Sequence, residues 1–203
     1  MNDTASETPR RGIRALLTTS TALLITLALL KFVLHMVTNM LGGYGYFRDE
    51  LYYLACSEHL AFGYVDQPPL SIILLAINRL ILGDSLVALR FLPAVAGAIT
   101  VYLSGAIARD LGGGRFAQLL AGIGSIVSIV FLAADTFYSM NAFEALFWAA
   151  SFLLLVRIST TGDHRCWIWL GVVLGLGLLN KISVLWLGPG LEQYYCCQIS
   201  AGG

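Results

Sequence analysis

The sequence has little charge. Asp, Glu, Lys and Arg make up 12% of its 203 residues, whereas 58% are apolar. Soluble domains carry about a quarter charged residues, so an ordinary water-soluble domain is excluded, and so is disorder, which needs high net charge and low hydrophobicity. The twelve basic and twelve acidic residues cancel, which leaves no basic excess for nucleic-acid binding. The sequence therefore predicts an all-α polytopic membrane protein, in contact with the lipid bilayer and not with nucleic acid.

Cysteine is also scarce. The four residues are too few and too irregularly spaced for a disulfide framework or a zinc site. We expect each to occupy an ordinary apolar position. They are Cys56, Cys166, Cys196 and Cys197.

Long apolar stretches are plentiful. A helix needs about 20 apolar residues to cross a bilayer. We read the first stretch as an uncleaved span, since no small-x-small cleavage site follows Leu30; a cleavable signal peptide is the alternative. The five stretches of spanning length are about 15–40, 85–108, 116–134, 142–158 and 167–188.

The arginines predict the topology. Three of them lie in the polar residues 1–14, which we therefore place in the cytoplasm, at the inner (plasma) membrane. The stretch 68–82 is ambiguous, because it has only 15 residues. If it crossed the membrane, the arginine-bearing loops near 109–115 and 157–165 would both lie outside, against the positive-inside rule.

We therefore predict one long outer segment, residues 41–84, with two interfacial helices at about 49–60 and 68–82. The resulting topology also places Asp135 on the outer face, beside Asp49.

The outer segment contains the string GYGYFRDELYY at residues 43–53. Acidic residues in a first helical turn suit the helix dipole, and this is a sufficient structural explanation for them. Helical geometry also puts Asp49 on one face with Tyr53, whereas Glu50 points about 100° away. We take Asp49 as the inward residue, because its face is the aromatic one. There it is positioned to act as a general base toward a hydroxyl.

A second string, GYVDQPPL, follows at residues 63–70. The residue before a proline is held extended, and proline is favoured in a first helical turn. We expect Asp66 and Gln67 to form an extended approach and Pro68 to start the second interfacial helix. For the prolines alone, a rigid turn is the simpler interpretation.

The order of these features resembles the integral-membrane glycosyltransferases of the C-type fold, and within them glycosyltransferase family 39 and its bacterial relatives. These include the protein O-mannosyltransferases and the aminoarabinose transferase that modifies lipid A. The resemblance covers residues 15–190. It implies the N-terminal part of a C-type membrane domain with about five transmembrane helices.

The resemblance implies an enzyme that transfers a sugar from a polyprenyl-phosphate donor to a protein or glycolipid hydroxyl on the outer face, with inversion. Asp49 matches the family's general base, Glu50 its companion, and Arg48 and Tyr53 flank them. Asp66 and Pro68 match the second motif of the loop. Gln67 stands where relatives often carry Lys or His, so it offers the donor phosphate a hydrogen bond without a charge.

A second acidic cluster matches the family at 135–144 (DTFYSMNAFE). Asn141 is able to cap the following helix with Glu144 in its first turn. A carboxylate entering a span is costly, which favours a role in a pocket. Asp135 and Glu144 are thus candidates to position the acceptor or a divalent metal, although no metal ligand is assigned.

Cations for the leaving lipid phosphate are few. We rank Arg48 first, then Arg90, five residues into its span, then Lys181. Lys181 lies 14 residues past Trp167, which is about 21 Å along a helix. It either faces the phosphate or an acid, or snorkels outward.

The last 13 residues, LEQYYCCQISAGG at 191–203, do not resemble the family, which predicts a truncated or frame-shifted product or a fragment. A transporter component and a non-catalytic membrane partner are the competing functions. The long outer loop favours the enzyme.

Overall fold

The computed structural model describes residues 7–190, with side-chain surroundings from residue 19 onward; the atypical tail lies outside the described residues. Between residues 7 and 190 every element is helical, which confirms the all-α prediction. The elements in chain order are α1 (Glu7–Leu41), α2 (Arg48–Glu58), α3 (Leu70–Leu82), α4 (Leu86–Leu89), α5 (Phe91–Asp110), α6 (Arg115–Val127), α7 (Ile129–Ala134), α8 (Met140–Thr161), α9 (Arg165–Asn180) and the 3-10 helix η1 (Ile182–Trp186).

Three helical stretches are long and apolar enough to cross a bilayer: Thr19–Leu41, Leu86–Asp110 and Met140–Thr161. The other two predicted spans are interrupted. The third breaks at Ser128 into α6 and α7, and the fifth ends at Asn180, since Lys181 is extended (φ −159°, ψ 136°). Five spans therefore remain a prediction, whereas the described residues contain three helical stretches that are long and apolar enough to span.

Local sequence signals set several of the helix ends. The side chain of Ser85 caps α4 by accepting from the backbone N–H of Ala88, and Ser139 caps α8 in the same way from Asn141. Gly162 ends α8 in a left-handed conformation (φ 65°), which glycine adopts without strain.

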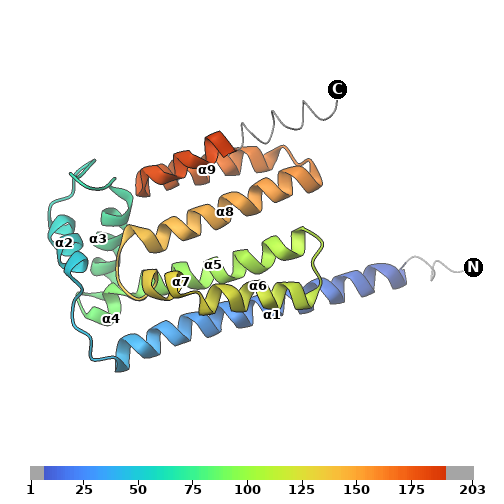
Figure 1. Cartoon of the computed structure of the whole chain (residues 1–203), viewed down its shortest axis with the longest axis horizontal. Helices are drawn as coiled ribbons and strands as arrows, with labels where there is room; N and C mark the ends of the chain where they lie inside the picture. The colour runs from blue at the N-terminus through green and yellow to red at the C-terminus, as the bar shows by residue number, and fades with distance from the viewer. Residues whose placement is uncertain (1–6, 191–203) are drawn as a thin grey trace, which may run out of the picture.

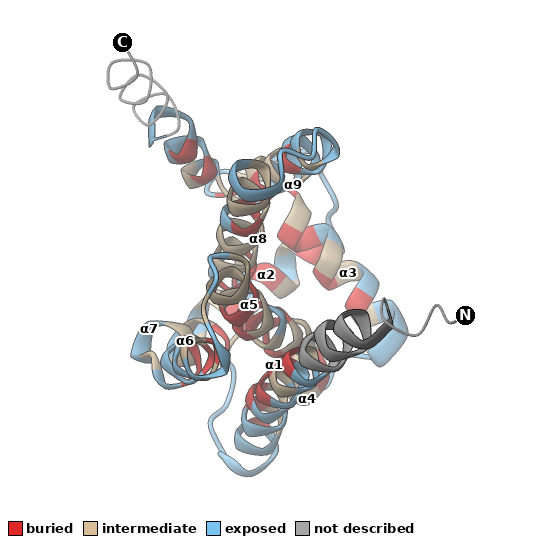
Figure 2. Cartoon of the chain, turned by 90° about the vertical axis from the view of Figure 1, so that its right-hand side faces the viewer, coloured by how far each residue is buried: buried red, intermediate tan, exposed pale blue. Residues whose placement is uncertain are grey.

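α5 is the centre of the bundle. It packs against α1, α6 and α8, and α9 covers α8 (Figure 1). Small residues allow the close approach: a Cβ at Gly105 would collide with Leu24 of α1, and a Cβ at Gly122 would lie 2.7 Å from Leu27 Cδ1. Buried residues gather where the helices face one another, while the outer surfaces are exposed (Figure 2). The exposed side chains include Leu29 and Leu30, as expected where lipid replaces water.

The segment 41–84, with α2 and α3, forms a cap at one end of the bundle, and the short helix α4 follows it there (Figure 1). The α5–α6 and α8–α9 connections lie at the opposite end, the end at which α1 begins. The two arginine-bearing loops thus lie at the same end as the start of α1, whereas the side of the membrane that this end faces stays a prediction. Two helices occur in the cap, as predicted, but the second begins at Leu70 rather than at Pro68, because Pro69 takes the N-cap position.

Candidate active site

The buried carboxylate of Glu50 organises the start of α2. Its Oε1 accepts from Arg90 Nε at 2.9 Å and from the Tyr138 backbone N at 2.9 Å. Its Oε2 accepts from Arg90 Nη2 and from the Phe47 backbone N, each at 2.8 Å. Both charged side chains are buried, with 0% of Glu50 and 4% of Arg90 exposed. Four hydrogen bonds occupy the carboxylate and fix its orientation.

Arg90 connects the same carboxylate to the loop before α2. Its Nη2 also donates to the carbonyl oxygen of Gly45 at 2.9 Å. Beside this contact the rings of Phe47 and Phe137 stack with centroids 4.4 Å apart. The aromatic loop 43–47, the start of α5 and the loop before α8 are thereby held against one another.

Asp49 lies outside this network. The buried residues of α2 are Glu50, Tyr53 and Ser57, so the prediction that Asp49 is the inward member of the pair is wrong. Glu50 turns inward because Arg90 and the backbone N–H groups of Phe47 and Tyr138 donate hydrogen bonds to its carboxylate there. The Asp49 side chain is 44% exposed and pairs with Arg48 at 3.3 Å, itself 91% exposed. Asp49 is therefore the carboxylate of the pair that a substrate can reach.

Tyr53 joins α2 to the start of α8. Its hydroxyl accepts from the Met140 backbone N at 3.0 Å, and its ring meets Tyr138 edge-on at 5.5 Å. Burial raises the pKa of Tyr53 to about 12, so its hydroxyl stays protonated near neutral pH. These contacts make Tyr53 a packing residue of the site.

The second motif of the outer segment lies beside α2. The Cys56 thiol, burial and then Asp66 raise the pKa of Tyr52, so the exposed Asp66 side chain is close to this tyrosine. Gln67 is buried, its carbonyl oxygen accepts from Tyr64 N at 3.1 Å, and its side-chain Nε2 has no partner within residues 19–190. Pro68 is half-buried.

A second polar cluster joins α8 to the break after α9. Lys181 Nζ lies 2.6 Å from Glu144 Oε2 and 2.9 Å from Asn141 Oδ1. Ser183 Oγ donates to the other oxygen of Glu144. Lys181 thus pairs with an acid at a helix end, and is neither deep in a span nor snorkelling past Trp186.

Two further predictions need correction. Asn141 does not cap α8, because Ser139 takes that position. Arg90 does not face solvent as a phosphate ligand, because Glu50 and Gly45 occupy its guanidinium.

Asp135 also turns away from the outer surface. Its carboxylate lies 3.1 Å from Lys31 Nζ, with both side chains at most 3% exposed. Gly97 makes room for it, since a Cβ there would collide with the Asp135 carboxylate. The loop that follows Asp135 does reach α2, through Tyr138, but the expected meeting of Asp135 with Asp49 does not occur. An aspartate inside the bundle satisfied by a lysine is a structural pair.

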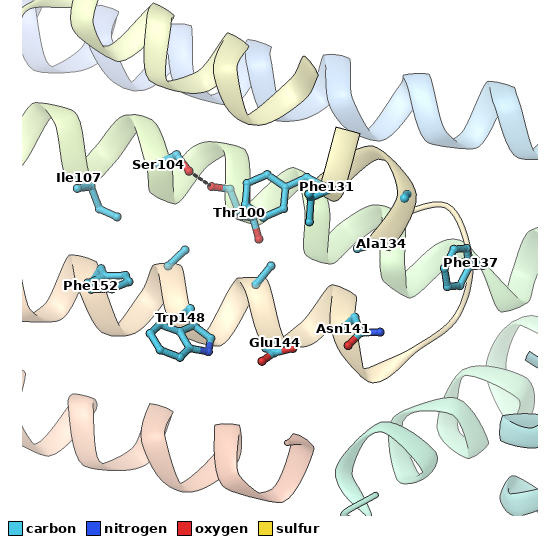
Figure 3. A pocket seen from close by; sticks show the side chains of 14 residues that line it. Thr100, Ser104, Ile107, Phe131, Ala134, Phe137, Asn141, Glu144, Trp148 and Phe152 are labelled. Atoms are coloured by element: carbon cyan, nitrogen blue, oxygen red, sulfur yellow. Dashed lines mark hydrogen bonds between the residues drawn. The ribbon is translucent and has the colours of Figure 1, made fainter. Parts of the chain in front are cut away.

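A cavity of about 680 Å³ lies between α5, α7 and α8 (Figure 3). Its walls are mainly apolar, from Ile107 and Phe152 at one end to Phe131 and Phe137 at the other. Asn141 and Glu144 are the polar lining residues from the first turns of α8, with Asn141 nearer to Phe137 and Glu144 next to Trp148 (Figure 3). The cavity therefore combines a long apolar wall with polar residues of α8.

The described residues contain no group of three or more His, Cys, Asp or Glu side chains able to hold a metal ion. Sequence reasoning missed two buried residues of this region, Lys31 as the partner of Asp135 and Tyr138 as a donor to Glu50. The hydroxyl of Tyr138 donates to the Ser71 carbonyl oxygen at 2.6 Å. The only signal for Tyr138 was its place in the acidic motif, and the backbone N–H that it contributes has no sequence signature.

The profile of the dolichyl-phosphate-mannose-protein mannosyltransferase family matches residues 66–196. The chain belongs to this family. It is also 30% identical over 104 residues to the polyprenol-phosphate-mannose–protein mannosyltransferase of Corynebacterium glutamicum.

That alignment covers 51% of this chain and 19% of the relative, so the chain spans about a fifth of the relative's length. No solved structure matches the chain. The family supports a membrane glycosyltransferase of the mannosyltransferase kind, whereas the likeness to the aminoarabinose transferase stays a prediction.

Proposed function

We propose that this chain takes part in transferring a mannose-type sugar from a polyprenyl-phosphate carrier to a protein hydroxyl on the outer face of the plasma membrane, with inversion. Residues 1–14 would lie in the cytoplasm. The observation that carries the proposal is the contrast between two adjacent carboxylates at the start of α2, one buried and one exposed. Glu50 and Arg90 are buried and saturated, and they hold the neighbouring Asp49 at the surface, where an acceptor can reach it.

Asp49 is the general base in this proposal. It accepts the proton of the acceptor hydroxyl while the hydroxyl oxygen attacks the anomeric carbon. The new glycosidic bond forms as the bond from that carbon to the phosphate oxygen breaks. The electron pair leaves with the polyprenyl phosphate, and a single displacement inverts the configuration. Glu50 acts as a positioning residue, because its oxygens are already occupied.

The leaving phosphate needs stabilising charge or hydrogen-bond donors. Lys181 replaces Arg90 as the better candidate, since it contacts Glu144 and Asn141, which line the cavity, and its side chain is 31% exposed. Arg48, exposed beside Asp49, is the second candidate. The apolar wall of the cavity suits a prenyl chain entering from the bilayer, and Glu144 and Asn141 would hold the lysine in place.

The proposal is tested by reconstituting the chain in lipid vesicles with polyprenyl-phosphate [14C]mannose. A serine- and threonine-containing peptide is supplied in one arm and a glycolipid in the other. We expect label in the peptide, and a β-linked donor should give an α-linked product.

The Asp49→Asn variant, inserted equally well, is the control without a base. Label in neither acceptor with wild-type protein would refute the enzyme proposal in favour of a non-catalytic membrane partner. Movement of an unmodified solute across the vesicle membrane would favour a transporter component.

A further inference from the structure

A second cavity, of about 490 Å³, lies between the end of α1, the loop that follows it and α7. It touches α7 at Leu132 and the turn after α7 at Thr136, whereas the larger cavity touches α7 at Phe131 and Ala134. The two cavities therefore use different faces of the same short helix. The proposed chemistry assigns no role to the smaller one.

Two buried polar groups line this cavity without a partner. His35 and Asn39 are one turn apart on α1 and lie on the same face of it. They are 2% and 9% exposed. Within residues 19–190, neither His35 Nε2 nor Asn39 Nδ2 has a hydrogen-bond partner. Buried polar groups normally have hydrogen-bond partners, so two unpartnered nitrogen atoms in one cavity indicate a polar ligand.

The charges around the cavity are already neutralised. Arg90 lines it, but its guanidinium is bound to Glu50 at 2.8 Å. Lys31, one turn before His35 on α1, is paired with Asp135 at 3.1 Å. Among residues 19–190, those that line the cavity offer an anion no unpaired cation, which favours a neutral ligand with several hydroxyl groups.

The remaining lining fits such a ligand. Thr38 and Thr136 donate their hydroxyl hydrogens to the carbonyl oxygens of Leu34 and Leu132, at 2.8 Å and 2.6 Å. The Thr38 oxygen is left to accept, and Thr136 Oγ1 lies 3.5 Å from His35 Nδ1, on the other side of the imidazole from Nε2. Tyr44 and Leu132 supply an aromatic ring and an apolar wall. A sugar ring has hydroxyl groups at its rim and C–H groups on its faces. It therefore binds where hydrogen-bond donors and acceptors lie next to apolar side chains.

We propose that this cavity is a binding site for a neutral pyranose ring, with Asn39 and His35 contacting its hydroxyls. The inference deepens the proposed function and rests on it for its biological role. The ring is either the sugar of the polyprenyl-phosphate donor or a sugar already present on the acceptor.

The first test is direct and needs no transfer activity. The full chain, labelled with 15N at histidine and held in detergent micelles, is titrated with methyl α-mannoside. The sequence has three histidines, so His59 and His164 are internal controls. We expect the ring resonances of His35 to shift with saturation and those of the other two to stay unchanged. An unmoved His35 would overturn the inference, as would a shift caused by inorganic phosphate alone.

Variants provide the second test. Asn39→Leu and His35→Phe keep size and shape while removing hydrogen-bonding atoms, and we expect each to weaken mannoside binding about five- to tenfold. Thr26→Val is the matched control on α1, because its exposed hydroxyl contacts only its own helix at Ala22. Equal affinity in all three variants would contradict the assignment. If a variant fails to fold, the histidine titration of the wild type decides alone.

The source of the sugar follows from competition. Two competitors are compared: a ten-carbon prenyl-phosphate mannose and the same prenyl phosphate without the sugar. If only the first displaces methyl mannoside, the cavity binds the sugar of the donor. Joint binding of the glycolipid and the mannoside identifies an acceptor sugar. Mannoside binding at His35 without any transfer activity would refute the proposed function alone, whereas transfer without such binding would refute this inference alone.

Discussion

Replacing Arg90 by methionine removes the cation from a buried carboxylate. Three hydrogen bonds disappear with the guanidinium, two to Glu50 and one to Gly45. Glu50 keeps two backbone donors, those of Phe47 and Tyr138. Breaking a buried ion pair from one side costs about 3–5 kcal/mol. Since half of the hydrogen bonds to Glu50 survive, we expect the lower end, about 3 kcal/mol.

The assay is thermal or denaturant unfolding of the purified protein in micelles. A loss of about 3 kcal/mol corresponds to a melting temperature lowered by roughly 6–12 °C for a chain of this size. The double variant Glu50→Gln with Arg90→Met leaves no charged side chain at this position, and it should recover about 1–2 kcal/mol of the loss. Arg48→Met, which breaks the exposed pair with Asp49, is the matched control and should leave the melting temperature unchanged. An Arg90→Met protein as stable as the control would refute the account of Glu50 as the residue that fixes α2.

Three further predictions concern packing, titration and the donor site. Gly97→Ala should lower the unfolding free energy by about 1–3 kcal/mol, because the new Cβ displaces Asp135. Gly175→Ala is the control, because a Cβ added there meets no neighbouring atom within 4 Å, and it should leave the unfolding free energy unchanged. Equal losses of unfolding free energy in the two variants would disprove the clash at Gly97. The pKa of Tyr53 is raised to about 12, so its contribution to stability is complete below pH 10 and is lost as the pH rises through 12. Between pH 9 and pH 12 the free energy of unfolding should therefore fall less steeply with pH in Tyr53→Phe than in the wild type. Parallel curves of unfolding free energy against pH would contradict the burial of the Tyr53 hydroxyl. Lys181→Met should raise the KM for the polyprenyl-phosphate donor more than that for the acceptor peptide, and an unchanged donor KM would exclude the lysine from phosphate binding.

The helices were predictable where apolar stretches and capping residues agree. The bounds of α2 and α8 fall within a few residues of the predicted ranges, because a charged first turn marks the start of α2 and a long apolar stretch marks α8. The cap of α8 was predicted at Asn141, two residues after the Ser139 that forms it. The interruptions were not predictable. Ser128 and Lys181 leave the helical conformation inside stretches that are mainly apolar and long enough to span. In the sequence, Lys181 stood out as a cation in its stretch and not as a helix end.

The sequence singled out several residues of this region, but not their orientations. The motif drew attention to Asp49 and Glu50, and the search for cations drew attention to Arg90, but local helical geometry put the wrong carboxylate inward. Which of the two carboxylates turns inward depends on Arg90, 40 residues after Glu50 in the chain, and on the backbone N–H of Tyr138. Neither lies on the helix, so no pattern within residues 43–53 encodes it.

The central claim is that Asp49 is the base and Glu50 its support. It is tested most directly by comparing Asp49→Asn with Arg48→Gln in the vesicle transfer assay, with unfolding measured on the same samples. We expect the first variant to lose transfer by at least about 100-fold, as removal of a general base does. It should unfold like the wild type, because the side chain is exposed, and the second variant should keep its activity to within a few fold. Wild-type transfer by the Asp49→Asn protein would contradict the account.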